Sequence, residues 1–403
     1  MFTMKKSWAI GGVLALSSVL YARSACDDVD LYFGNVSSVS EISLDVIRVD
    51  CPELTYREEL EEIVIESGHT LTITTTRDYV RFVNVRFTVE GNASLTFDLP
   101  RTLFGPNSGS SGDDESDYII DVEEGGTVTF TGKARASKVE NVRSVFNNNG
   151  VIEFQGDTLF NNNGNVFRSN YGTIKFRGDS VFKNNDYLAV DNQGADAYVR
   201  FSKEAYFENN GGAFDGSQGC AISNEEGTAS FHGEAYFVDH DGYDGGAVYN
   251  GGKMRFYDKV KFYNNSNFGE WGGGCRSSNG TLEFKAAVQF IGNVADYGGG
   301  LAVTGGDVTF HKGVLFEENG ANVNGGAFSL TLGDQFTDDD ETDDVVPGSL
   351  TFSKPEAVSY ADNYIVDSKY NDEVVTGCTL AYVENGTTLI GFDVDDLCME
   401  DTV

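Results

Sequence analysis

The sequence predicts an all-β protein, a single parallel β-helix of about eleven coils with a cap at each end. Two observations carry this prediction. A segment with two phenylalanines six residues apart recurs through the middle of the chain at intervals of 22 to 30 residues. The apolar residues of these segments alternate with polar ones, as in a half-buried strand, and lack the period of a helix. Repeats of this length are typical of solenoids, in which each unit buries its apolar face against the next.

The repeat is defined by its phenylalanines and by one asparagine. In "GVIEFQGDTLFNNNG" (150–164), Asn163 follows the second phenylalanine by three residues, and five other copies share this asparagine, whereas His240 replaces it in the remaining one. Weaker copies place Ile73, Phe97 and Phe130 before the seven clear ones and Phe352 after them. The clear pairs are Phe154/Phe160, Phe176/Phe182, Phe201/Phe207, Phe231/Phe237, Phe256/Phe262, Phe284/Phe290 and Phe310/Phe316.

Each unit is expected to contribute three short strands. Two of them end in the two phenylalanines, and a third begins with paired glycines, at 211, 245, 272, 298 and 325. Equivalent residues of neighbouring coils then stack in columns. We expect the phenylalanines to form the core, since burying each is worth about 1.5–3 kcal/mol, and the asparagines to stack inside a turn.

The ends of the chain differ from the repeats. Residues 1–24 have the basic, apolar and small segments of a secretory signal peptide, so we expect a secreted or surface protein. Residues 25–66 are interpreted as an N-terminal cap with a short helix at 54–66, residues 67–363 as the repeats, and residues 364–403 as a C-terminal cap. Disulfides are expected between Cys26 and Cys51 and between Cys378 and Cys398. Cys220 and Cys275 are expected to be buried thiols.

Charge narrows the classes of partner. The formal net charge is −35, which argues against nucleic acid and anionic membranes. The apolar stretch near the start is about 12 residues, shorter than the roughly 20 that cross a bilayer, so we expect no membrane insertion. No cofactor is expected. The acidic run at 338–344 leaves Ca²⁺ as an alternative, although it lacks the spacing of a calcium loop.

The two repeated motifs resemble those of a known family. The F-x-x-N motif (Phe160 to Asn163) and the G-G-A-apolar motif (Gly245 to Val248) resemble the repeat of the chlamydial polymorphic outer membrane proteins, over roughly residues 126–363. The resemblance implies a right-handed parallel β-helix, a pectin-lyase-like fold, and a role as a surface adhesin. The implied partner is a polysaccharide or a component of the cell surface or extracellular matrix.

One segment offers a catalytic interpretation. "FVDHDGYDGG" (237–246) resembles the histidine-containing acidic motif of alginate epimerases, which implies His240 as a base with Asp239, Asp241 and Asp244 beside it. The alternative is that His240 fills the asparagine position of its repeat. His232 and His311 share a column, but three coils separate them by about 14 Å, too far to share a metal.

The outward columns contain no paired carboxylates that recur at the separation used by glycosidases. The column before the first phenylalanine and the column after it are both chemically mixed. We therefore expect a secreted or surface-associated scaffold for adhesion, structure or carbohydrate binding that acts without catalysis. The alternative is a polysaccharide lyase or epimerase acting on an acidic polysaccharide.

Overall fold

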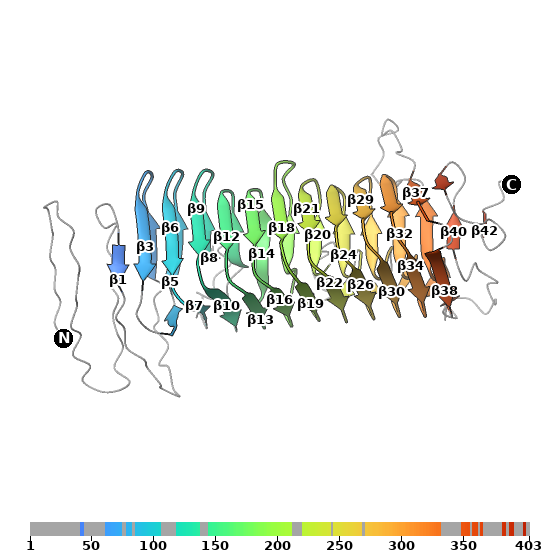
Figure 1. Cartoon of the computed structure of the whole chain (residues 1–403), viewed down its shortest axis with the longest axis horizontal. Coiled ribbons are helices and arrows are strands. Elements are labelled where there is room, and N and C mark those ends of the chain that lie inside the picture. The colour runs from blue at the N-terminus through green and yellow to red at the C-terminus, as the bar shows by residue number, and fades with distance from the viewer. Residues whose placement is uncertain are drawn as a thin grey trace, which may run out of the picture.

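The computed structural model is a right-handed parallel β-solenoid, and it confirms the predicted all-β class. Figure 1 shows the strands stacked side by side, with the chain advancing along the long axis from β1 toward β42. No α-helix occurs within the ranges that the structure describes. These ranges are 41–43, 61–74, 78–82, 85–105, 118–137, 144–211, 220–242, 245–267, 271–331, 348–354, 357–361, 363–365, 381–383, 387–390 and 398–399.

Three long sheets, named A, B and C here, form the sides of the solenoid, and every pairing between their strands is parallel. Sheet A has 13 strands. They are β1 (Glu41–Ser43), β3 (Thr70–Thr74), β6 (Ser94–Asp98), β9 (Thr127–Phe130), β12 (Val151–Phe154), β15 (Thr173–Phe176), β18 (Tyr198–Phe201), β21 (Thr228–Phe231), β25 (Lys253–Phe256), β29 (Thr281–Phe284), β33 (Asp307–Phe310), β37 (Ser349–Phe352) and β41 (Thr388–Ile390).

Sheet B precedes sheet A in each coil and also has 13 strands. They are β2 (Glu61–Ile65), β5 (Val85–Val89), β8 (Tyr118–Val122), β11 (Ser144–Asn148), β14 (Asn165–Asn170), β17 (Val190–Asn192), β20 (Ile222–Asn224), β24 (Val248–Asn250), β28 (Cys275–Ser277), β32 (Leu301–Thr304), β36 (Phe328–Thr331), β40 (Ala381–Val383) and β42 (Cys398–Met399).

Sheet C follows sheet A in each coil and has 11 strands, and a five-stranded small sheet follows it in the later coils. Sheet C contains β4 (Val80–Phe82), β7 (Arg101–Phe104), β10 (Lys133–Ser137), β13 (Thr158–Asn161), β16 (Ser180–Lys183), β19 (Ala205–Glu208), β22 (Ala235–Val238), β26 (Val260–Tyr263), β30 (Val288–Ile291), β34 (Val314–Glu317) and β38 (Val358–Ala361). The small sheet contains β23 (Asp241–Gly242), β27 (Ser266–Asn267), β31 (Val294–Tyr297), β35 (Gly320–Asn324) and β39 (Tyr364–Ile365).

The number of turns differs slightly from the expectation. The solenoid has about nine turns, whereas about eleven coils were expected. The three strands per coil are as predicted. The small sheet was not predicted, since its two- to five-residue strands carry no repeated sequence pattern.

The predicted phenylalanine core is confirmed. The sheet A phenylalanines stack face to face from Phe97 to Phe352, for example Phe176 on Phe201 with ring centroids 4.7 Å apart and planes 2° apart. A second stack in sheet C runs from Phe160 to Phe316. The two stacks meet edge to face inside each coil, a favourable aromatic geometry. The core is therefore two aromatic ladders that lock one coil onto the next.

The predicted asparagine ladder also exists, in the turn after sheet C. Asn185 Nδ2 donates to Asn210 Oδ1 in the next coil at 2.6 Å and to the Phe160 carbonyl in the preceding coil at 3.3 Å. The residue before each ladder position has a left-handed backbone, with φ of 51° at Asn184 and 48° at Asn209. Asparagine tolerates this conformation better than most residues do. One turn type thus repeats along the solenoid.

Paired glycines start the sheet B strands for a steric reason. At Gly298 the φ is 64°, and a Cβ atom on Gly300 would lie 2.6 Å from the Ala327 carbonyl oxygen of the next coil. In one coil the prediction is wrong. Ile222 pairs in register with Val248, so the segment ending at Ile222, and not the glycine pair at 211, is the equivalent of the Gly245–Val248 motif.

The predicted helix at 54–66 is wrong over its described part. Residues Glu61–Ile65 form strand β2, which pairs in parallel with β5, and Ile63 and Ile65 point into the core. Pairing with the neighbouring coil and the β-branched side chains outweigh the local capping signal. Within both predicted caps, strands β1, β2, β40, β41 and β42 extend the sheets.

The thiols of Cys220 and Cys275 are buried, as predicted. Three other expectations fall outside the described residues. They are the signal peptide at 1–24, the acidic run at 338–344, and the disulfide pairs, of which Cys398 alone lies in a described strand.

Candidate functional site

The structure places His240 in the asparagine ladder. Its Nδ1 lies 3.1 Å from the backbone nitrogen of Asn210, and its own backbone nitrogen donates to Asn265 Oδ1 at 3.1 Å. The residue is 1% exposed, and its Nε2 has no hydrogen-bond partner. Burial lowers its pKa to about 4, against the raising effects of the Asn210 and Phe207 backbone and of Asp239. A buried neutral imidazole in a structural ladder favours the alternative in which His240 takes the asparagine position of its repeat. The catalytic role stays an untested prediction.

The two described aspartates of the three proposed around His240 do not form a common site with it. Asp239 is exposed and occupies the left-handed turn position, with φ of 54°. Asp241 is exposed in β23 and accepts a hydrogen bond from Ser266 at 3.1 Å. Asp244 lies outside the described residues. The two described aspartates therefore point to solvent while the imidazole points into the solenoid.

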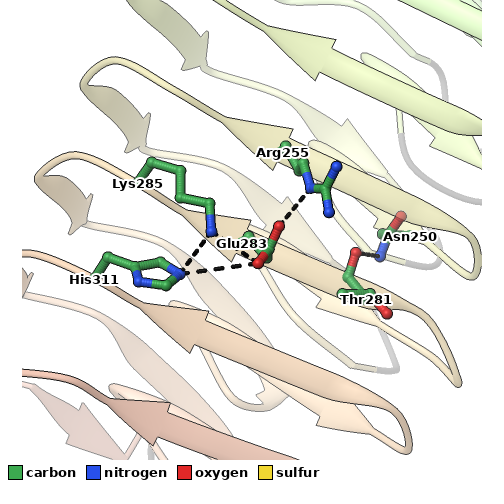
Figure 2. A network of polar contacts seen from close by, with 6 residues as sticks. All are labelled: Asn250, Arg255, Thr281, Glu283, Lys285 and His311. Atoms are coloured by element: carbon green, nitrogen blue, oxygen red, sulfur yellow. Dashed lines mark hydrogen bonds and ion pairs between the residues drawn. The ribbon is translucent and has the colours of Figure 1, made fainter.

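The outer face of sheet A carries the best-developed surface network. Glu283 accepts a hydrogen bond from Arg255 in the preceding coil and another from Lys285 in its own coil, at 2.8 Å for the latter. Lys285 Nζ also lies 2.9 Å from His311 Nε2 in the following coil. Figure 2 shows Glu283 at the centre of these groups, with Arg255 on one side and Lys285 and His311 on the other. Hydrogen bonds from Lys285 and Arg255 lower the pKa of Glu283 despite its partial burial.

A second group lies earlier on the same face. The His232 ring stacks on the Tyr257 ring of the next coil, with centroids 4.5 Å apart, and Tyr257 is 43% exposed. Burial and the Arg200 charge lower the pKa of His232. Arg200 Nε is itself buried and has no hydrogen-bond partner. His232 contacts Tyr257 and His311 contacts Lys285, so the two histidines have different neighbours.

A buried carboxyl group, which the sequence reasoning missed, lies on sheet B. Asp191 accepts a hydrogen bond from Gln193 at 2.6 Å through Oδ2, whereas its Oδ1 has no partner. It is 7% exposed. Burial first, and then the Glu225 charge, raise its pKa to about 8. Groups with strongly shifted pKa values are candidates for functional sites. Asp191, however, is nearly inaccessible to solvent, unlike the network on sheet A.

A second asparagine ladder was also missed. It runs along the ends of the sheet B strands, and each Nδ2 donates to the next Oδ1, at 2.7 Å between Asn148 and Asn170 and at 2.8 Å between Asn224 and Asn250. All of its members are fully buried. A sequence signal existed, since each of these asparagines lies two or three residues before a glycine. The members are Asn148, Asn170, Asn192, Asn224 and Asn250.

The described residues contain no group of three or more His, Cys, Asp or Glu side chains placed to hold a metal ion. Nor does any helix in the described ranges have the length and apolar character needed to cross a membrane.

Comparison with known proteins adds no relative. No protein-family model matches the chain, and no curated protein and no solved structure matches it significantly. The parallel sheets, the aromatic core and the buried ladders define the class of the protein as a right-handed parallel β-solenoid.

Proposed function

We propose that this protein is a secreted or surface-associated β-helix scaffold that acts without catalysis, by presenting a rigid outer face to a polysaccharide or to a cell-surface or extracellular-matrix component. One observation carries the proposal. The recurring asparagines, and His240 at the equivalent position, lie inside the solenoid and form hydrogen bonds that join neighbouring coils. What remains outside is the outer face of long stacked sheets, which suits adhesion.

The resemblance of the repeats to those of the chlamydial polymorphic outer membrane proteins supports the same function. Both motifs of that family have a physical role in this chain. Asn185 of an F-x-x-N motif belongs to the turn ladder, and Val248 of a G-G-A-apolar motif belongs to the sheet B core column. We therefore propose an adhesin-like role and a pectin-lyase-like subtype of β-helix, with export to the cell surface or medium.

The alternative, a polysaccharide lyase or epimerase centred on His240, has weaker support. A general base must reach the proton that it removes, and His240 is enclosed by the neighbouring coils. Its depressed pKa keeps the imidazole neutral at pH 7, which a base requires, but burial alone explains that shift.

The experiment that tests the proposal measures binding and turnover in one sample. The full chain is incubated with acidic and neutral polysaccharides and with intact cells or matrix, with and without Ca²⁺. Bound protein is quantified, and new reducing ends, unsaturated uronates and epimers are followed by NMR. We expect binding without product. Product that disappears in His240→Ala, in a variant that keeps its fold by circular dichroism, would overturn the scaffold function in favour of the enzyme.

A further inference from the structure

The outer face of sheet A has a charge opposite to that of the whole chain. The chain has 28 Lys and Arg against 63 Asp and Glu. Over β12 to β33, the outward positions of sheet A hold six cations and three acids, a local net charge of +3. The cations are Lys175, Arg177, Arg200, Lys253, Arg255 and Lys285, and the acids are Glu153, Glu283 and Asp307. This face, called the basic face below, is thus a cationic strip on an anionic protein.

Half of these cations have no acidic partner within the described part of the chain. Arg177 pairs with Glu153 at 3.2 Å, and Arg255 and Lys285 share Glu283. By contrast Lys175, Arg200 and Lys253 form no ion pair among the described residues. Their charges remain available to an anion from outside.

Arg200 is a suitable contact for an anion on this face. Its Nε is buried without a hydrogen-bond acceptor, which is unfavourable for a buried donor. Its charge also contributes to the lowered pKa of His232, so the two side chains lie within electrostatic reach of one another. A carboxylate placed against Arg200 would accept from the terminal nitrogens of the guanidinium and neutralise its charge. Arginine suits such a group because it can donate two parallel hydrogen bonds.

The arrangement of the basic face suits an extended polymer. Lys175, Arg200, Ser230 and Arg255 occupy one register column on successive strands, about 4.8 Å apart. The stacked pair of His232 and Tyr257 lies in the adjacent column and offers an exposed aromatic group. Cations, hydroxyls and an aromatic ring along a straight line match the carboxylates, hydroxyls and ring faces of a linear sugar chain.

We propose that the basic face binds a linear polyuronate, with Arg200 and Lys175 contacting its carboxylates and Tyr257 its sugar rings. This inference rests on the proposed scaffold function and names its ligand class and surface. A polyuronate is favoured over a sulfated chain because the charge of the face is modest and Glu283 lies within it, which disfavours a densely charged polymer.

The test compares two double variants of the full chain. Lys175→Ala with Arg200→Ala removes two cations from the basic face. Lys183→Ala with Lys261→Ala removes two from the outer face of sheet C and is the matched control. Binding of oligogalacturonate, dextran sulfate and neutral dextran is measured by calorimetry at low and high salt. We expect the first variant to lose about tenfold or more in affinity for oligogalacturonate, and the control to bind like the wild type.

An NMR titration of His232 reports on binding close to Arg200. A general loss of positive charge from the protein would not reproduce this signal. The pKa of His232 is held down by burial and by Arg200. A carboxylate bound beside Arg200 would raise that pKa. Addition of oligogalacturonate should therefore shift the His232 titration to higher pH in the wild type and in the sheet C control, and should cause no further shift in the basic-face variant.

Each outcome decides something different. If both double variants bind oligogalacturonate equally, or if dextran sulfate alone is bound, the assignment of polyuronate to the basic face is overturned while the scaffold function stands. The same holds if no polysaccharide binds but the protein still adheres to cells or matrix. If the folded chain binds none of these, both the inference and the proposed function fail.

Discussion

The Nδ1 atom of His240 lies 3.1 Å from the backbone nitrogen of Asn210, in the position that an asparagine side-chain oxygen occupies in the neighbouring coils. The imidazole thus reproduces one ladder contact. It leaves its second nitrogen, Nε2, buried without a partner. The sequence suggests a catalytic motif at His240. In the folded chain, this histidine replaces one asparagine of a structural ladder and reproduces only part of its hydrogen bonding.

Replacing His240 by asparagine should stabilise the protein. In His240→Asn, the side-chain amide can donate to Asn265 and to the Phe207 carbonyl, as its equivalents do in other coils, and the unpartnered nitrogen disappears. We expect the free energy of unfolding to rise by about 1–2 kcal/mol at pH 7.5, as measured by chemical denaturation. His240→Ala is the control and should be less stable than the wild type. A destabilised His240→Asn protein would contradict the ladder role.

The same variant should change the pH dependence of stability. The pKa of His240 is about 4 in the folded chain, below its unfolded value of about 6.5. As the pH falls through 6.5 toward 4, the unfolded chain binds a proton that the folded chain does not, so the wild type loses stability. Between pH 7.5 and pH 5 the advantage of His240→Asn should grow by about 2 kcal/mol. An unchanged difference would show that the imidazole titrates normally.

Truncating a regular ladder residue should be costly. Asn293→Ala removes the acceptor of the Asn265 side chain and backbone, and the donor to Asn319 and to the Phe262 carbonyl. Buried groups lose their partners on both sides, so we expect a loss of about 2–4 kcal/mol in a denaturant titration. Asn161→Ala, at an outward position of the adjacent strand β13, is the control. Equal effects of the two substitutions would mean that the ladder adds little.

Asp191 should make the protein less stable as the pH rises. Its pKa is raised to about 8 in the folded chain, so between about pH 4 and pH 8 the folded chain holds a proton that the unfolded chain releases. Stability then falls with rising pH, by up to about 1.4 kcal/mol per pH unit from this group. Asp191→Asn should remove that fall, so its advantage over the wild type should be larger at pH 8 than at pH 5. Melting temperatures at the two pH values check this, and identical shifts would refute it.

Glu283 should restrain ligand binding on the basic face. Glu283→Gln removes the carboxylate that Arg255 and Lys285 share. Because the pair is partly exposed, stability should change by less than about 1 kcal/mol, whereas affinity for oligogalacturonate should rise severalfold and become more salt-dependent. Glu317→Gln, on the outer face of sheet C, is the matched control. Weaker binding by Glu283→Gln would contradict the charge argument.

Particular residues show how far sequence reasoning reached. The Phe154 and Phe176 columns and the Asn185 and Asn210 ladder follow from spacing alone, because residues at one position of each coil must stack. The buried thiols of Cys220 and Cys275 were also predicted. The helix over 61–65 and the strand start at Gly211 were predicted wrongly, because local signals there compete with pairing to a neighbouring coil.

By itself, the sequence determined the all-β class, the parallel coils and the aromatic and asparagine ladders, since a repeat of nearly constant length places the same side chains in the same column. The tertiary structure alone decided which outward side chains meet. The intervals between repeats vary, so the partners of Glu283, the burial of Asp191 and the unpartnered Nε of Arg200 depend on how successive coils pack. The local charge and the exposure of a side chain on a solenoid face depend on the neighbouring coils, so the sequence of a single repeat does not determine them.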